Sequence, residues 1–377
     1  MNNSMTSDHF APLDFHGASP RNTLALREWH AGAAPVRAVE PHFPIVDPHH
    51  HLFGTEQDTH YYCLDDLRHD LSGGHNIIGT IYVEGYQSGW RTTGPEALRP
   101  VGEVERIVDL ARTPTRTPHG ACQLAAAIVA HADLTLGDSV AGVLEQQIAA
   151  AEGRLRGVRH RTATDNGTVG RFIINRPRPG LMQDPGYMRG VAQLKRFGLS
   201  LDAWLYHTQI DDLITLADAS PDTTLVLNHI GGVIGVAEYR SQRAQVLASW
   251  EKRLRALAQR PNVHVKLGGM GMTVFGFGFE HRTRPAPAAE LAQAWKPMID
   301  LCIEIFGTQR CMFESNFPVD KQSCCYTELW NAFKLITASL SPDERRDLFY
   351  RTACRVYHLP ELAELGDQLS ACHGRPG

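Results

Sequence analysis

The sequence has no long run of apolar residues, no long run of like charges and no Cys-x-x-Cys pair. No stretch is apolar enough to span a bilayer, and the polar residues 1–40 lack the apolar core of a secretory signal. A net charge of −4 and a pI near 6.5 offer no basic surface to nucleic acid or to anionic membranes. We therefore predict a cytoplasmic protein that acts on a small molecule and binds neither nucleic acid nor membrane, and we leave a homodimer open.

The eight cysteines are scattered and form no evenly spaced framework. Cysteine-ligated metal sites and disulfide-rich domains space their cysteines regularly, so neither is indicated. In a chain of 377 residues we expect these cysteines to be reduced, mostly buried and structural. The adjacent Cys324 and Cys325 are poorly placed to pair with each other.

Apolar runs alternate with amphipathic stretches along most of the chain, which is 43% hydrophobic and can bury a large core. Eight runs are expected to be strands, at 43–48, 77–84, 122–130, 155–160, 199–206, 223–229, 262–267 and 310–314. The stretches between them are expected to be helices, at 102–112, 138–151, 187–197, 210–219, 241–259, 288–306 and 327–338. Eight such repeats predict an α/β fold, a (β/α)8 TIM barrel whose strands are buried on both faces.

This pattern predicts three regions. The barrel is expected to occupy residues 41–360, and residues 341–358 to form its closing helix after Ser341 and Pro342. A polar N-terminal extension that can be flexible is expected at 1–40, and a C-terminal tail at 361–377. Two Gly- and Pro-containing stretches, 162–185 and 268–287, follow strands, so we expect extended loops at the C-terminal mouth of the barrel.

Three consecutive histidines follow the first predicted strand. Side chains alternate along a strand, so His49 and His51 point to one side and His50 to the other. Two imidazoles at this spacing can bind one metal ion. A chance cluster or a solvated loop is the alternative, and His50 is expected to pack and not to bind an ion.

Polar side chains also follow the other predicted strands. His207 and His229 come at the ends of the fifth and sixth strands, where either alone would be an ordinary buried histidine. Arg159, at the fourth, is either an ion-pair partner or a bidentate clamp for a substrate carboxylate. We assign it to substrate binding together with Tyr206 and Gln209, which also lie at the end of the fifth strand.

Five motifs occur in strand order, D-P-H-H-H-L at 47–52, G-V-R-H at 157–160, Y-H-x-Q at 206–209, L-N-H-I-G-G at 227–232 and M-F-E-S-N-F-P-V-D at 312–320. Together they resemble the amidohydrolase superfamily, and more narrowly its branch of TIM-barrel metal-dependent hydrolases, which includes sugar-acid lactonases and pyrone-dicarboxylate lactonase. The resemblance covers residues 43–358. It is specific for the fold and weak for the substrate, because one barrel supports many chemistries through its loops.

The resemblance implies a metal site formed by His49, His51 and His207, with a catalytic role for His229. No lysine occupies the fourth-strand position at which binuclear members hold a bridging carbamylated residue. It therefore implies a single divalent cation at most, with Zn²⁺ as the first candidate. Some lactonases of this branch work without a tightly held metal, so occupancy stays open.

The eighth strand departs from the family pattern. The family usually ends this strand with G-S-D-W-P, and its aspartate moves the proton; here Glu314 replaces the glycine and Asn316 the aspartate. An amide does not take a proton from water, although its carbonyl can orient one. We predict that Glu314 takes over part of the acid–base role, with Asn316 as orienter. The alternative makes Glu314 a structural partner of Arg159 or Lys266.

The favoured function is hydrolysis of a lactone, or of a related ester or amide, of a small anionic substrate. Water would attack with assistance from a metal or from the histidines and arginines. A non-oxidative decarboxylase on the same barrel is the first alternative. A catalytically impaired barrel, with Asn316 as its cause, is the second.

Overall fold

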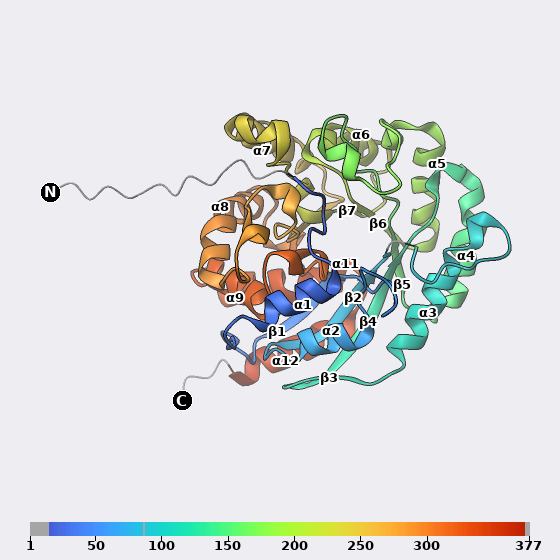
Figure 1. The fold of residues 1–377 in the computed structure, drawn as a ribbon. Helices are drawn as coiled ribbons and strands as arrows, with labels where there is room; N and C mark the ends of the chain where they lie inside the picture. The colour runs from blue at the N-terminus through green and yellow to red at the C-terminus, as the bar shows by residue number, and fades with distance from the viewer. Residues whose placement is uncertain (1–14, 86, 374–377) are drawn as a thin grey trace.

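The computed structural model describes residues 15–85 and 87–373. Eight parallel strands follow one another around one sheet in chain order (Figure 1). They are β1 (Pro44–His50), β2 (Asn76–Val83), β4 (Gly120–Ala130), β5 (Leu155–Val158), β6 (Ser200–Ala203), β7 (Leu225–Leu227), β8 (Val263–Leu267) and β9 (Cys311–Phe313). The predicted (β/α)8 barrel is confirmed.

The first and last strands meet through the backbone just beyond β9. The amide of Asn316 donates to the carbonyl of His49 at 2.9 Å, and the amide of His51 donates to the carbonyl of Phe317 at 2.8 Å. These two bonds bring the strand-eight motif against the histidine triplet. Closure of the barrel thus places two segments together that are more than 260 positions apart in the chain.

Helices cover the outside of the barrel. They are α2 (Leu64–Leu71), α3 (Val101–Ala111), α4 (Val140–Ala150), α5 (Pro185–Leu194), α6 (Ile210–Ala219), α7 (Arg243–Leu257), α8 (Ala288–Phe306) and α9 (Tyr326–Ile336). The sequence did not predict the eight-residue α2, nor the short strand β3 (Thr115–Thr117), which forms an antiparallel pair with the start of β4. Every residue of β1 and β2 is buried, as expected for strands packed on both faces.

The closing helix consists of three short segments, α10 (Pro342–Arg346), a π-helical turn (Asp347–Arg351) and α11 (Thr352–Val356). Ser341 caps it as expected, accepting from the amide of Glu344. A further helix, α12 (Pro360–His373), occupies most of the region predicted as a tail. Its Leu362 is buried in the space that a side chain at Gly79 of β2 would fill. Residues 374–377 of that region lie outside the described residues.

The structure describes the N-terminal extension from Phe15 onward, and residues 1–14 lie outside the described residues. It contains α1 (Thr23–Ala31), whose Trp29 is buried. All eight cysteines are free and five are buried, as predicted. Among the described helices, none combines the length and apolar character that crossing a bilayer requires.

Candidate active site

A cavity of about 140 Å³ lies among residues that follow the carboxyl ends of the strands. Five of the predicted site residues line it, His51, Arg159, Tyr206, His229 and Asn316. His49 and Glu314 are fully buried and do not line the cavity, but His49 contacts Arg159 and Glu314 contacts His229. The cavity thus lies where a (β/α)8 barrel holds its active site.

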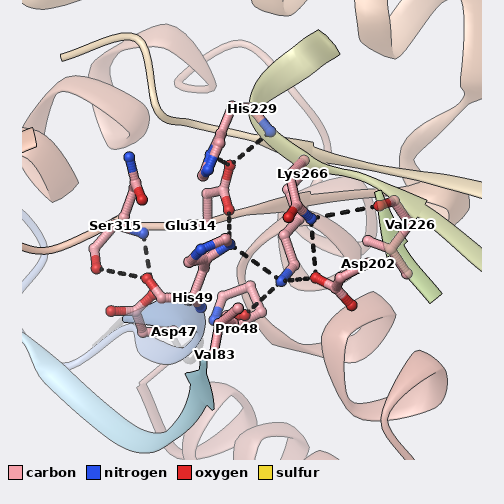
Figure 2. Close-up of polar contacts among 12 residues, drawn as sticks. Asp47, Pro48, His49, Val83, Asp202, Val226, His229, Lys266, Glu314 and Ser315 are labelled. Carbon is pink, nitrogen blue, oxygen red and sulfur yellow. Dashed lines mark hydrogen bonds and ion pairs between the residues drawn. The ribbon is translucent and has the colours of Figure 1, made fainter. Parts of the chain in front are cut away.

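Glu314 lies between two imidazoles (Figure 2). Its Oε1 is 2.7 Å from His229 Nδ1 and accepts from the backbone amide of His229 at 3.1 Å. Its Oε2 is 2.8 Å from His49 Nδ1. The carboxylate therefore fixes the ring of His229 and leaves Nε2 as the nitrogen available to the cavity.

The backbone around this pair is unusual in two places. His229 and Ile230 both have positive φ, 54° and 49°, a conformation that non-glycine residues rarely adopt and that clusters at functional sites. Gly268 and Gly269, just after β8, leave the room that the pair needs. A Cβ at 268 would lie 2.4 Å from Glu314 Cγ, and one at 269 would lie 2.5 Å from His229 Cγ.

His49 is contacted by charged side chains on both sides of its ring. Its Nε2 is 3.2 Å from an Nη of Arg159, and a guanidinium only donates, so Nε2 accepts. Nδ1 is 2.8 Å from Glu314 Oε2 and 3.3 Å from Lys266 Nζ. An ammonium also only donates, so Nδ1 accepts from Lys266 when it carries the lone pair and faces Glu314 as a donor when it carries the ring hydrogen.

Lys266 and Asp202 form a fully buried ion pair beside His49 (Figure 2). Lys266 Nζ donates to Asp202 Oδ2 at 2.7 Å and to the carbonyl of Pro48 at 2.8 Å. Asp202 also accepts from Tyr357 Oη at 2.9 Å. Lys266 lies near the end of the seventh predicted strand, 262–267, whereas Asp202 was not predicted as a site residue because it lies inside an apolar strand and belongs to no motif.

The guanidinium of Arg159 already donates hydrogen bonds to other groups of the protein. Its Nε donates to Glu84 Oε1 and another nitrogen to the Glu84 carbonyl, both at 2.8 Å. Arg161 Nε lies 3.4 Å from the same carboxylate, and its side chain is 23% exposed. Two guanidinium groups thus share one carboxylate, which leaves a net positive charge on the cavity wall, and Arg161 is the more accessible of the two.

The other two predicted metal ligands are placed differently from each other. His51 lines the cavity, and its Nδ1 lies 2.9 Å from the Val83 carbonyl. His207 does not line it; its Nδ1 accepts from the amide of Ile234 at 3.3 Å. Its ring therefore holds the loop after β7. His50 points to the other face, 2.9 Å from Thr80 Oγ1, as its expected packing role requires.

Gln209 also lies away from the cavity. Its Oε1 accepts from the amides of Thr164 at 3.0 Å and Tyr206 at 3.2 Å, and its Nε2 donates to the carbonyl of Thr162 at 2.8 Å. All three of these hydrogen bonds are made with backbone groups. Gln209 thus joins two mouth loops, while Tyr206 contributes to the cavity wall.

Asn316 faces the cavity from a left-handed residue with φ 53°. β9 has already ended at Phe313, so the strand alternation that would place Glu314 and Asn316 on one face does not apply. Asn316 Nδ2 donates to Asp320 Oδ1 at 2.8 Å, and Asp320 Oδ2 accepts from the amide of Gly271 at 2.8 Å. Asp320 is fully buried and does not lie in an exposed loop.

This contact explains why residue 316 is an amide. An aspartate there would place two buried carboxylates about one hydrogen-bond length apart, with burial already raising the pKa of Asp320. We expect Asn316→Asp to lower the free energy of unfolding by about 3 kcal/mol, measured by denaturant titration. Combining it with Asp320→Asn restores an amide–carboxylate pair and should recover most of the loss. A single variant as stable as the wild type would contradict this explanation.

Burial controls protonation at the centre of the site. It raises the pKa of Glu314 to about 8, against the opposing effects of Lys266 and the His229 amide. It also lowers the pKa of His229 and His49 well below the ordinary value, with Arg159 and Lys266 acting in the same direction. Both imidazoles are therefore neutral near pH 7.

Three side chains are close enough to share one ion, and they are not the predicted set. The ligand atoms of His49, His229 and Glu314 lie within 4.8 Å of one another, and no other such group occurs among residues 15–85 and 87–373. As arranged, they do not fit a resident cation. The lone pair of His49 is taken by Arg159, and Arg159 and Lys266 both place positive charge beside the site.

Removing the competing guanidinium should therefore improve metal binding. We expect Arg159→Met to bind Zn²⁺ at least about tenfold more tightly than the wild type, because it frees His49 Nε2 and removes a charge. Competition against a chelating dye, with metal content measured on the same samples, gives the affinities. His207→Ala is the control and should match the wild type. Stoichiometric zinc that dialysis against chelator cannot remove from the wild type would contradict the argument.

Comparison with known proteins places this geometry in a family. The family model described as "Amidohydrolase" matches residues 46–359. An uncharacterized protein, y4mH, from Sinorhizobium fredii is 29% identical over 84% of this chain and 98% of its own. An L-fucono-1,5-lactonase from Burkholderia multivorans is 31% identical over 56% of this chain and 65% of its own.

Solved structures agree. An amidohydrolase from Burkholderia multivorans with bound zinc is 26% identical, with a TM-score of 0.62, over 84% of this chain and 99% of that one. A second structure of an amidohydrolase from Burkholderia multivorans, with bound HEPES, is 25% identical, with a TM-score of 0.63, over 84% of this chain and 99% of that one. The zinc is a property of that protein, whose site need not carry the contacts of Arg159 and Lys266.

Proposed function

Because the chain belongs to the amidohydrolase family and is a hydrolase, we propose that it hydrolyses a lactone, or a related ester, of a small anionic molecule. One observation carries the proposal: the His229–Glu314 pair and the positively charged Arg159–Arg161 wall line or adjoin the same cavity. A base beside a cationic surface suits attack on a carbonyl whose product is a carboxylate. The named lactonase relatives support the choice of lactones.

The proposed reaction uses groups of this chain. His229 Nε2 takes a proton from a water molecule oriented by the Asn316 carbonyl, and Glu314 stabilises the imidazolium that forms. The water oxygen bonds to the lactone carbonyl carbon, and the ring C–O bond breaks. The leaving oxygen takes the proton back from His229. Arg161 binds the anionic group of the substrate, and Arg159 holds Glu84 and His49 in place.

Zn²⁺ or another divalent cation remains the cofactor that the sequence suggests. In this family a bound cation polarises the attacking water or the carbonyl. In the arrangement described, an ion would have to displace the contact of Arg159 with His49, so the proposal assigns it no step.

A lactone panel tests the function. Purified protein, treated with chelator or supplied with Zn²⁺, is mixed with sugar-acid and aromatic lactones, and acid release is followed with a pH indicator. We expect turnover in both metal conditions. Carbon dioxide release from hydroxybenzoates without any lactone turnover would instead indicate a decarboxylase, and no turnover of either class would indicate an impaired barrel.

The pH profile should report the His229–Glu314 pair. With the pKa of Glu314 raised to about 8, its carboxyl is protonated below that pH and bonds His229 Nδ1 as a donor, which places the ring hydrogen on Nε2. His229 then lacks a lone pair toward the cavity. We expect kcat/KM to rise with pH and level off above about 8. A profile flat from pH 6 to 9 would contradict the role of this pair.

A further inference from the structure

The N-terminal segment before α1 crosses the mouth of the barrel (Figure 1). The carbonyl of Gly17 accepts from Thr273 Oγ1 at 2.8 Å, in the loop after β8. Arg21 exchanges two hydrogen bonds with Gln322, at 3.2 and 2.8 Å, in the loop after β9. The segment is thus attached to two of the loops that surround the cavity, and Phe15 and Ala18 reach its lining.

Phe15 and Phe172 form an aromatic corner at the cavity. Their rings meet edge to face with centroids 5.1 Å apart. Gly17 lets the two segments approach, since a Cβ there would lie 3.1 Å from Phe172 Cδ1 and its φ is 89°. Phe172 and the neighbouring Ile174 stay 43% and 67% exposed although both line the cavity. Large apolar side chains left open at a cavity mark a surface that a ligand covers.

The cavity lining is divided by chemistry. One set is charged or polar and adjoins the proposed reaction centre: His51, Glu84, Arg159, Arg161, His229 and Asn316. The other set is mostly apolar, and we call its apolar members the apolar wall: Phe15, Phe172, Ile173, Ile174, Met272 and Val274. Two polar residues, Asn175 and Thr273, lie among them, and the Thr273 hydroxyl donates to the carbonyl of Gly17. A sugar lactone carries hydroxyl groups around its ring, and against the apolar wall most of these would lose water without gaining a partner, since the neighbouring lining offers two polar side chains, Asn175 and Thr273. An aromatic or alkyl body loses nothing there and gains by burial.

We infer that the substrates of this enzyme join a carboxylate or lactone head to an apolar, preferably aromatic, body, and that Phe15 and Phe172 determine this specificity. The inference rests on the proposed function for the reaction, and adds the substrate class. The head lies at Arg161 and His229, and the body against the apolar wall. The N-terminal extension is then part of the binding site, since it supplies one of the two aromatic rings.

Product binding tests the inference without requiring turnover. We expect calorimetry on the full chain to give 3-(2-hydroxyphenyl)propanoate, the product of dihydrocoumarin hydrolysis, at least about tenfold higher affinity than D-gluconate. Phe15→Ala and Phe172→Ala should each reduce this ratio about threefold or more. Leu24→Ala is the control, because Leu24 is 63% exposed on α1 and does not line the cavity. Equal affinities, binding of neither acid, or a ratio unchanged in both phenylalanine variants would overturn the inference.

Kinetics separate this inference from the proposed function. Dihydrocoumarin turnover above that of D-glucono-1,5-lactone, with a KM that rises in Phe172→Ala while kcat holds, supports both. Preference for the sugar lactone overturns the substrate class and leaves lactone hydrolysis standing. Absence of lactone turnover together with a retained tenfold preference for the aromatic acid overturns the proposed function and leaves the substrate class standing.

Discussion

Glu314→Gln should lower kcat/KM for the best lactone by about 10²- to 10⁴-fold. The glutamine keeps the size of the side chain but removes the charge that stabilises protonated His229, 2.7 Å away. Its amide can accept from only one of the two facing imidazoles, where the carboxylate faces both His229 and His49. Steady-state kinetics across pH 6 to 9 should also show that the rise toward pH 8 is gone, because the titrating group has been removed.

Glu103→Gln is the matched control for this prediction. Glu103 is also buried, and its carboxylate accepts from Tyr82 Oη at 2.6 Å and from Trp90 Nε1 at 2.8 Å, but it does not line the cavity. We expect that variant to lose stability and to keep its pH profile. If Glu314→Gln retains full activity with an unchanged profile, Glu314 is only a structural partner of the histidines, and the base must be sought elsewhere.

The fold could be predicted because apolar runs and amphipathic stretches alternate regularly along the sequence. Each barrel strand is buried on both faces and therefore appears as an apolar run, and all eight predicted runs are strands. α2 was missed because LDDLRHDL is short and mostly charged. α12 was missed because its main anchor, Leu362, packs on Gly79, and a contact between distant residues has no local signature.

The site was predictable only in part, for a related reason. Motifs identify which residues reach the mouth, but hydrogen bonds between distant segments decide what each can do there. His207 and Gln209 match their motifs, yet the backbone uses the nitrogen of one and the amide of the other. Phe15 lies in a polar extension with no motif, and only the tertiary structure brings it to Phe172 and the cavity.

Glu314 shows what the sequence did indicate. A carboxylate at a position where the family has glycine implied a relocated acid, and the structure places that acid between His49 and His229. The larger glutamate side chain at position 314 needs space, and Gly268, just after the neighbouring strand β8, leaves that space because it has no side chain. Two positions on adjacent strands therefore have to be considered together, and a single motif shows only one of them.

Lys266→Met should lower the free energy of unfolding by about 3–5 kcal/mol, because it leaves Asp202 charged and buried without its cation. Both side chains of the pair are fully buried, 2.7 Å apart, so water cannot replace the lost partner. The shift in denaturant midpoint at constant slope measures the loss. Lys195→Met is the control, since the pair of Lys195 with Asp222 at 2.6 Å is exposed and its removal should change little.

The double variant Lys266→Met with Asp202→Asn identifies the cause of that loss. Asparagine keeps a hydrogen-bonding group for Tyr357 but carries no charge, so most of the lost stability should return. Activity should not return with it, because Lys266 also donates to the carbonyl of Pro48 and so holds the end of β1 that carries His49. Recovery of stability without recovery of kcat/KM would show that Lys266 positions the site as well as neutralising Asp202. A single variant as stable as Lys195→Met would mean that the buried charge is compensated by another group.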